Sequence, residues 1–325
     1  MKVAHFAIVT PRLCGLYETT VELIRELRLL GIDSRIVDPK PINDLNLKQD
    51  RGIPIESLKW AGEADLLISH SGLGEMEDCG KPIIHIAHGR PRHSFLTEES
   101  GGTPVYSYHY DTNKKEQFKS IVTFWPEHKP YLDVMYPDKP VYVVQSPVDL
   151  DFWKPEKTDY DFGGKGGNIN IVCTDAFRND IDCYEPLNAY ALWARENKGA
   201  KLHIFGKPKG MKGWGALIRR IQDDGNMGLI QGWAAELQRV YNSADLLITG
   251  HSINVRSVRE AMACGCPIVR INDIENPGIS EGLKQKRSRV REEAVRLFNP
   301  KESARQFIEV LNAATEYDVK LRGSY

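Results

Sequence analysis

The sequence predicts an α/β protein built from two doubly wound units with parallel sheets, and three observations point to it. Short β-rich runs alternate with amphipathic stretches at helical spacing along most of the chain. At 325 residues, the chain is longer than one hydrophobic core usually serves. A segment rich in Pro, Asp and Gly, from 145 to 168, interrupts the alternation near the middle.

The N-terminal half begins with an expected buried strand over 2–9 and an expected helix over 17–30. Within that helix Val21, Ile24 and Leu27 recur at helical spacing, and Gly31 ends it. The further expected strands of this half are 34–37, 66–69, 82–87, 120–124 and 141–144. Each is short and has polar or turn-forming residues nearby, which is typical of an open parallel sheet.

A second βα series comes after the interruption. Its expected strands are 169–173, 201–205, 228–230, 245–249 and 267–271, and its expected helices are 184–196, 213–222, 234–241, 254–263, 284–298 and 302–316. We therefore expect one Rossmann-like domain at 1–147, an interdomain linker at 148–167 and a second Rossmann-like domain at 168–300. The terminal helix at 301–325 is expected to pack back toward the N-terminal domain.

Composition narrows the class of protein. The 43 Lys and Arg residues almost balance the 44 Asp and Glu residues, so a broad basic face for nucleic acid is not demanded. The six cysteines are scattered without a C-x-x-C pair, which disfavours a zinc site or a disulfide framework. No apolar run approaches the ~20 residues that span a bilayer, and the first apolar stretch is too short for a signal peptide. We expect a cytoplasmic protein without membrane insertion.

Candidate site residues lie just after the expected strands, where ligands bind in open parallel sheets. In the N-terminal half they are Gly15, His70, His88, Arg90 and Arg92. In the C-terminal half they are Arg178, Gly206, Lys207, His251, Ser252, Asn254 and Glu260. Arginine and lysine beside glycine suit a diphosphate, and a nearby carboxylate can accept hydrogen bonds from a ribose. The absence of G-x-G-x-x-G and G-x-x-x-x-G-K-[ST] disfavours a dinucleotide oxidoreductase and a P-loop NTPase.

Four motifs then point to a family. The segment REAMACGCPIV (259–269) is similar to the EAMA-x-G-x-P-V signature of retaining GT-B glycosyltransferases of the family 4 type. CGLYETTVELIRELRLLGID (14–33), SPVDLDFWKPE (146–156) and ADLLITGHS (244–252) resemble three more motifs of that family, in the same order. The resemblance implies a GT-B fold, in which two doubly wound Rossmann-like domains face each other across a cleft. It also implies that the N-terminal domain binds the acceptor and the C-terminal domain binds the nucleotide sugar.

For the donor, the resemblance implies roles residue by residue. Glu260 matches the acid that holds the nucleotide ribose, whereas Ser252 stands where the family has the acid that contacts the donor sugar. His251 and Asn254 are the candidates to replace that acid. Arg178 resembles the basic residue that meets the diphosphate.

The family lysine expected near this diphosphate site is absent, because position 183 is Cys183. Lys207, in the loop that Gly206 opens, is therefore the candidate for the second charge. Gly15 matches the glycine on the phosphate side. His88 matches the histidine that approaches the transferred sugar, so His88 and Arg178 are the catalytic candidates.

Acceptor contacts are assigned to His70, Arg90 and Arg92. The implied reaction moves a sugar from a nucleotide-diphosphate sugar, first of all a UDP-sugar, to an acceptor hydroxyl. The resemblance also implies retention at the sugar, with neither a metal nor another cofactor. D-x-D triplets occur, for example at 149–151 and 159–161, but they do not argue for a metal because they are expected by chance in an Asp-rich chain.

The acceptor stays open between a hydroxymethylated DNA base, as in compact phage enzymes of this type, and a glycan or lipid. A phage enzyme would act in the host cytoplasm. The alternatives are a degenerate GT-B protein that binds nucleotide sugars without turnover, or a GT-B epimerase or phosphorylase.

Overall fold

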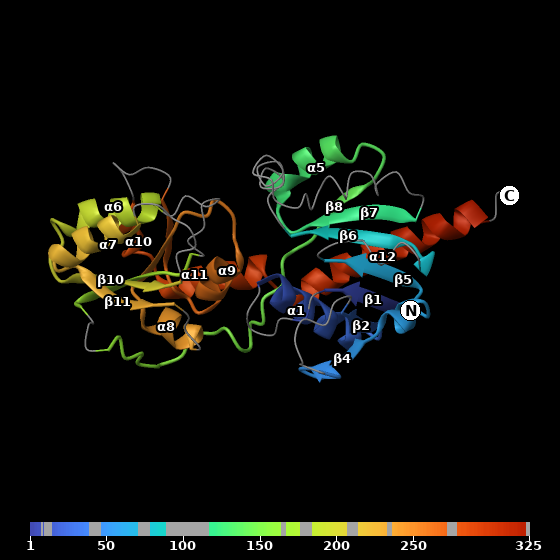
Figure 1. The fold of residues 1–325 in the computed structure, drawn as a ribbon, viewed down its shortest axis with the longest axis horizontal. Coiled ribbons are helices and arrows are strands. Elements are labelled where there is room, and N and C mark those ends of the chain that lie inside the picture. Colours follow the sequence, from blue (N-terminus) through green and yellow to red (C-terminus); the bar gives the residue numbers. More distant parts are fainter. Residues whose placement is uncertain are drawn as a thin grey trace. The chain divides into compact units, whose positions relative to one another are not determined.

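The computed structural model divides the chain into two compact units (Figure 1). The first unit comprises residues 1–147 and 299–325, and the second comprises 148–298. The structure describes residues 1–7, 9, 15–38, 47–70, 79–88, 117–163, 167–175, 184–206, 214–232, 236–271 and 278–322, without the side chains of residue 214 and of 316–322.

The sheet of the first unit has the strand order β3-β4-β2-β1-β5-β6-β7-β8. Its strands are β1 (Lys2–Phe6), β2 (Asp33–Val37), β3 (Gln49–Asp50), β4 (Ile53–Glu56), β5 (Leu66–Ser69), β6 (Ile83–Ala87), β7 (Phe118–Thr123) and β8 (Val141–Val143). The pairs are parallel except that β3 runs antiparallel to β4. The parallel arrangement brings the carboxyl ends of β1, β5 and β6 to the same edge of the sheet.

Helices of the first unit cover this sheet. They are α1 (Gly15–Leu29), α2 (Leu58–Ala61), the 3-10 helix η2 (Pro126–His128), α5 (Lys129–Met135) and α12 (Pro300–Arg322). The apolar stripe of α1 is buried, as its spacing predicts, with Val21 almost and Ile24 and Leu27 fully excluded from solvent. Helix α12 packs against α1 and β7, so the end of the chain completes the first unit.

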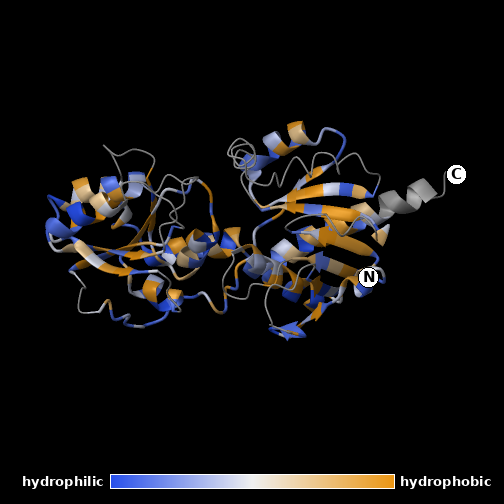
Figure 2. Cartoon of the chain, viewed as in Figure 1, coloured by the Kyte–Doolittle hydropathy of each residue, from blue (hydrophilic) through white to orange (hydrophobic). Residues whose placement is uncertain are grey.

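The second unit has a parallel sheet in the order β11-β10-β9-β12-β13. Its strands are β9 (Ile169–Cys173), β10 (Ala200–Phe205), β11 (Met227–Gln231), β12 (Leu246–Thr249) and β13 (Ile268–Arg270). Its helices are α6 (Tyr184–Ala194), α7 (Trp214–Asp223), α8 (Leu237–Ser243), α9 (Arg256–Ala263), α10 (Ile279–Gly282) and α11 (Arg287–Leu297). Figure 2 shows predominantly hydrophobic colouring along the strands of both sheets, as expected for strands buried under helices.

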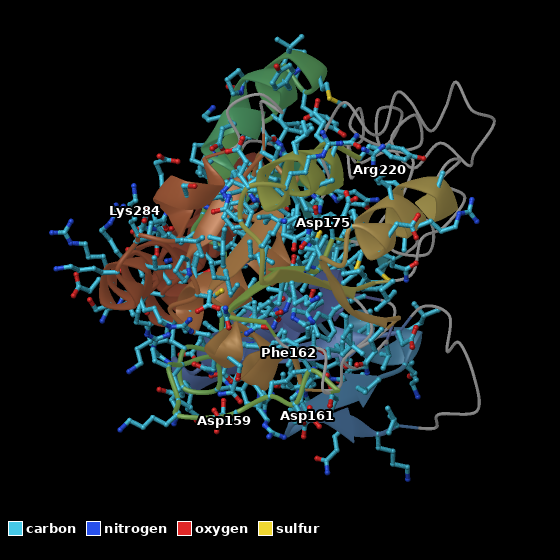
Figure 3. The ribbon with its side chains drawn as sticks, turned by 90° about the vertical axis from the view of Figure 1, so that its left-hand side faces the viewer. Asp159, Asp161, Phe162, Asp175, Arg220 and Lys284 are labelled. Carbon is cyan, nitrogen blue, oxygen red and sulfur yellow. The ribbon has the colours of Figure 1, made fainter. Side chains whose placement is uncertain are left out.

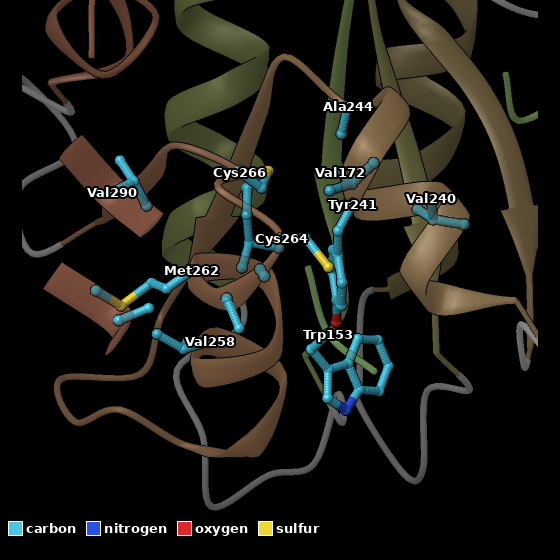
Figure 4. Packing of buried hydrophobic residues seen from close by; sticks show 14 of the residues in the cluster. Trp153, Val172, Val240, Tyr241, Ala244, Val258, Met262, Cys264, Cys266 and Val290 are labelled. Atoms are coloured by element: carbon cyan, nitrogen blue, oxygen red, sulfur yellow. The ribbon is translucent and has the colours of Figure 1, made fainter. Parts of the chain in front are cut away.

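The EAMA-type segment provides much of one core of the second unit. Met262, Cys264 and Cys266 pack with Tyr241 and Trp153 (Figure 4). Burial raises the pKa of the Cys266 thiol to about 12, so this cysteine is a neutral packing residue. The similarity of this segment to a family signature therefore coincides with a structural role in the core.

The segment predicted as a linker packs on the second unit. Between 148 and 163 it has neither helix nor strand, but its Trp153 and Phe162 are buried. Figure 3 shows Phe162 with the neighbouring Asp159 and Asp161. Arg291 of α11 donates hydrogen bonds to the Trp153 carbonyl, at 2.7 Å, and to the Leu150 carbonyl, at 2.9 Å.

Most expected strands and helices are found within a few residues of their predicted bounds. The first strand is shorter than expected and ends at Phe6, and the last helix extends to Arg322. Strands β3 and β4 and helices α2, α5 and α10 were not expected. None of the described helices combines the length and apolar character needed to cross a bilayer.

Candidate functional site

Histidines gather at the carboxyl ends of the first sheet. His70 and His88 directly follow β5 and β6, and His5 lies in β1 beside them. The His5 Nδ1 atom lies 3.0 Å from His70 Nε2, and His70 Nδ1 lies 2.9 Å from His88 Nε2. Two predicted site residues, His70 and His88, are therefore in direct contact. His5, which the sequence analysis did not single out, contacts His70 from the other side.

Helix α1 closes this histidine cluster from one side. Thr20 Oγ1 lies 2.9 Å from His70 Nδ1 and 3.0 Å from the Leu16 carbonyl, one helical turn earlier. Gly15, the predicted phosphate-side glycine, is the first residue of the helix, and its carbonyl accepts a hydrogen bond from Thr19 at 2.8 Å. The backbone at Gly15 therefore lies at a helix N-terminus, which attracts anions through its partial positive charge.

His5 and His70 are uncharged at neutral pH. Burial lowers the pKa of His5 to about 3. Burial also lowers the pKa of His70 well below its ordinary value, and the neighbouring His88, His5 and His85 lower it further. His88 is half-buried, with its ring edge-on to Phe124 at 5.3 Å between centroids. His5 and His70 thus offer polar but neutral hydrogen-bonding groups.

The carboxyl ends of β9 and β12 form a second polar cluster, in the second unit. Asp175, labelled in Figure 3, is buried and accepts hydrogen bonds from Thr249 Oγ1 at 2.7 Å and from the Gly250 amide at 2.8 Å. The Nε2 atom of the predicted donor residue His251 lies 3.8 Å from an Asp175 oxygen. Asp175 was not predicted as a site residue, although its position just after β9 was a signal for one.

The remaining predicted donor residues of this unit follow β12. Ser252 is exposed, and Asn254 accepts a hydrogen bond from Arg270 of β13. Glu260 lies inside α9, buried, and receives a hydrogen bond from Arg256 Nε at 2.5 Å. The carboxylate predicted to hold a ribose is thus held by a cation one helical turn earlier, an arrangement that fixes its orientation.

The other predicted residues fall into two groups. The Gly206 amide donates to the Gln231 carbonyl of β11 at 3.0 Å, so it is engaged within the sheet. Arg178, Lys207, Arg90 and Arg92 lie outside the described residues. Among the residues that are described, no group of three His, Cys, Asp or Glu side chains is arranged to hold a metal ion.

Sequence comparisons give no relative. The chain matches no protein-family model, and no curated protein matches it significantly. Structural comparison is decisive for the fold: the two parallel-sheet units form a GT-B fold, the class shared by the solved glycosyltransferases that resemble nearly the whole chain.

Three of these structures illustrate the range. HepE from Anabaena, in complex with UDP and glucose, is 13% identical with a TM-score of 0.73, and the match covers 96% of this chain and 100% of HepE. A sucrose-phosphate synthase from Thermosynechococcus elongatus is 12% identical with a TM-score of 0.70, covering 96% and 98% of the two chains. An alpha-glucosyltransferase in complex with UDP and a 13-mer DNA containing a HMU base is 13% identical with a TM-score of 0.64, covering 97% and 99%.

Proposed function

We propose that this protein is a glycosyltransferase that moves a sugar from a nucleotide-diphosphate sugar to an acceptor hydroxyl. The observation that carries the proposal is the full-length similarity to structures that hold UDP, UDP-glucose, or UDP together with DNA. Polar groups at the carboxyl ends of both sheets add support, because that edge is where such folds bind ligands. A UDP-sugar is the proposed donor.

The second unit is proposed to bind the donor. Glu260, held by Arg256, would accept hydrogen bonds from the ribose hydroxyls. His251, whose Nε2 atom lies 3.8 Å from an Asp175 oxygen, is proposed to contact the donor sugar in place of the acid that Ser252 replaces. Arg178 and Lys207 are proposed to meet the diphosphate.

The first unit is proposed to bind the acceptor. His70, Arg90 and Arg92 are the proposed acceptor contacts. Gly15 also belongs to this unit, and it is proposed to approach the phosphates of the donor through the α1 N-terminus. His88 is proposed to meet the transferred sugar.

The proposed chemistry follows from the charge of the leaving group. A departing nucleoside diphosphate gains negative charge, and preorganised cations and helix dipoles stabilise that charge in the transition state. We propose that Arg178, Lys207 and the α1 N-terminus do this without a metal ion. We also propose retention at the sugar, with the acceptor hydroxyl attacking from the face that the leaving group vacates and a leaving-group oxygen taking its proton.

A hydroxymethylated DNA base is the acceptor we propose to test first, with glycans second. The structural neighbour that holds DNA with a HMU base, matched over 97% of this chain, supports this order. The formal net charge of −1 does not favour DNA binding through a broad basic face, so we propose local contacts from residues such as Arg90 and Arg92.

A second candidate is a protein that binds a nucleotide sugar without turning it over. Ser252 favours it, because this side chain cannot supply the negative charge that the family acid places beside the donor sugar. An epimerase or phosphorylase on the same fold is the further alternative.

The test is UDP release from UDP-glucose, with and without hydroxymethylated DNA, in EDTA. We expect acceptor-dependent release and a thermal shift with UDP, since a ligand at 100 times its Kd adds about 2.7 kcal/mol of stability. Arg178→Ala is expected to lower turnover more than UDP affinity. A thermal shift without release on any acceptor would favour the binding protein. No shift with any nucleotide would contradict both.

A further inference from the structure

The three histidines of the first unit form one hydrogen-bonded chain. His70 stands in the middle, with Nε2 toward His5 and Nδ1 toward His88. A neutral imidazole carries one hydrogen, so each ring donates through one nitrogen and accepts through the other. The three hydrogen-bonded histidines therefore allow two consistent placements of their ring hydrogens. Either all three hydrogens sit on Nδ1 and donation runs from His5 to His88, or all sit on Nε2 and it runs the opposite way.

Both patterns require neutral rings, and the surroundings of His5 and His70 keep these two rings neutral. His5 is fully buried and His70 almost so. The His5 and His70 rings stack at 5.3 Å between centroids, and the His70 and His88 rings lie 5.2 Å apart. A charge on the central ring would face two other imidazoles in a desolvated space, which burial disfavours.

The surroundings of His5, the most deeply buried of the three histidines, distinguish the two patterns. His5 Nε2 is buried and has no hydrogen-bond partner among the residues that the structure describes. With hydrogens on Nε2, this atom would be a buried N–H without an acceptor, which folded proteins rarely tolerate. With hydrogens on Nδ1, it is an unprotonated nitrogen, which is the less costly unsatisfied group. The surroundings of His5 favour Nδ1–H.

The outer contact of His70 favours the same pattern independently. The Thr20 hydroxyl has one hydrogen, which is positioned to bond the Leu16 carbonyl at 3.0 Å. Its oxygen can then accept from His70 Nδ1–H at 2.9 Å, while His88 Nε2 shares the same hydrogen. In the opposite pattern the hydroxyl and His88 Nε2–H would compete for the single lone pair on His70 Nδ1. One of the two close contacts would then lack a hydrogen.

We propose that His5, His70 and Thr20 are positioning residues that fix His88 as its Nδ1–H tautomer. The Nε2 atom of His88 is then committed to His70, and its Nδ1 already carries a hydrogen. His88 consequently acts as a hydrogen-bond donor to a substrate oxygen and not as a general base. This role rests on the proposed glycosyltransferase function, whereas the tautomer itself does not.

The first test reads the tautomer directly in the full-length protein. Long-range proton–nitrogen correlation spectra of ¹⁵N-histidine-labelled protein distinguish Nδ1–H from Nε2–H rings, and His88→Gln identifies the His88 signals among the nine histidines. We expect His5, His70 and His88 all to show Nδ1–H, the form that free histidine disfavours. Nε2–H on His88 in the wild-type spectrum would overturn the proposal.

A matched pair of variants tests the positioning residue. Thr20→Val keeps the shape of the side chain but removes the hydroxyl, and Thr20→Ser keeps the hydroxyl. We expect Thr20→Val to raise the ratio of Nε2–H to Nδ1–H on His88 by about fivefold, the effect of one lost neutral hydrogen bond. Thr20→Ser is expected to keep the wild-type ratio. Equal ratios in folded samples of both variants would refute the role of Thr20.

Activity adds a readout that separates the two proposals. With UDP-glucose and the acceptor, Thr20→Val is expected to lower kcat with little change in KM, and Thr20→Ser to restore it. A wild type without UDP release would contradict the proposed function, yet its spectrum would still decide the tautomer. An unchanged kcat in Thr20→Val, together with a shifted tautomer ratio, would reject the donor role of His88.

Discussion

Both units gather polar side chains at the carboxyl edge of their sheet, but the first unit gathers imidazoles there and the second gathers carboxylates. In the first unit, the carboxyl ends of β1, β5 and β6 carry three histidines in contact, of which burial keeps His5 and His70 neutral. In the second, the carboxyl ends of β9 and β12 hold the buried Asp175, and α9 holds Glu260. Parallel-sheet topology sets where the polar groups gather, and the residue types then decide whether the edge presents imidazoles or carboxylates.

The two polar clusters differ in how completely their buried polar atoms are hydrogen-bonded. Each Asp175 oxygen has a hydrogen-bond donor at 2.8 Å or less, from Thr249 or Gly250. His5 leaves Nε2 without a hydrogen-bond partner in the described part of the chain. The buried carboxylate of Asp175 is therefore fully hydrogen-bonded, whereas the histidine cluster of the first unit keeps one unsatisfied buried nitrogen.

Removing the carboxylate of Asp175 should have the largest effect. Asp175→Ala deletes two hydrogen bonds to a buried charge and leaves the Thr249 hydroxyl and the Gly250 amide unsatisfied. We expect a loss of about 3–5 kcal/mol in the free energy of unfolding of the second unit. Urea denaturation, monitored through hydrogen exchange of peptides from each unit, would measure this loss of stability.

The matched control for this variant is Asp159→Ala. Asp159 is exposed, and its backbone carbonyl, which the substitution keeps, accepts a hydrogen bond from Arg239 at 2.7 Å. We expect a change within about 0.5 kcal/mol. Similar losses for the two aspartates would contradict the distinction between a satisfied buried carboxylate and a surface one.

Acid should weaken the first unit before the second. The pKa of His5 is lowered to about 3, and that of His203 in β10 to about 4, both by burial. A lowered histidine pKa means that the unfolded chain binds more protons, so stability is lost as pH falls below 6.5. At pH 5 each histidine should cost about 2 kcal/mol relative to pH 8. His70 adds a further loss in the first unit alone.

Hydrogen exchange at pH 8 and pH 5 would test this order, with peptides from β1 and β10 as reporters and rates corrected for intrinsic pH dependence. Protection in β1 should fall more than protection in β10. Equal losses in both, or a larger loss in β10, would show that the histidine cluster of the first unit is not the more acid-sensitive feature.

Packing around His203 gives a smaller effect, confined to the second unit. The His203 ring stacks on Phe162 at 4.0 Å between centroids and accepts a hydrogen bond from the Leu229 amide at 3.0 Å. A Cβ atom at Gly228 would lie 2.4 Å from the ring. Gly228→Ala should therefore cost about 1–3 kcal/mol.

Gly215 in α7 provides the control, since nothing lies within 4 Å of an added Cβ there. Because Gly215 is the second residue of α7, Gly215→Ala should stabilise by less than the value for a helix interior, up to about 0.5 kcal/mol. Thermal unfolding of both variants would show opposite signs. A stabilised Gly228→Ala would mean that β11 moves freely away from His203.

The sequence predicted the sheets well because apolar runs in parallel sheets are buried on both faces. β4 and α5 were missed because they are short and lack a clear period, as in the seven residues KPYLDVM of α5. His70 and His88 could be predicted from their positions after strands. Their contact with His5 could not, since it depends on β1 pairing with β5 across more than sixty residues.

Asp175 illustrates the same limit in the second unit. Its place after β9 was visible, but its partners Thr249 and Gly250 belong to the end of β12, which becomes a neighbour only in the folded sheet. A motif can indicate that a residue such as Glu260 is functional, but the orienting partner of a side chain depends on tertiary pairing. Arg256, which is only four residues away on the same helix, is the exception that sequence spacing could have found.

A last predicted effect, on ligand affinity, is the most specific for the proposed function. Glu260→Gln keeps the side-chain shape but weakens its acceptance of ribose hydroxyl hydrogen bonds, and about a tenfold loss of UDP affinity is expected, as for one hydrogen bond to a charged group. Glu260→Ala should weaken UDP binding further. Isothermal titration with UDP would measure both.

A matched variant separates a ribose contact from loss of helix stability. Arg256→Gln removes the cation that orients Glu260 but leaves the carboxylate in place, so it should weaken UDP binding less than Glu260→Gln does. UDP affinity equal to wild type in Glu260→Gln would contradict the ribose assignment. Equal weakening in both variants would mean that the ion pair as a unit, and not the carboxylate by itself, determines nucleotide affinity. The function of the second unit would then depend on the pairing of Glu260 with Arg256, just as the proposed role of His88 in the first unit depends on its contact with His70.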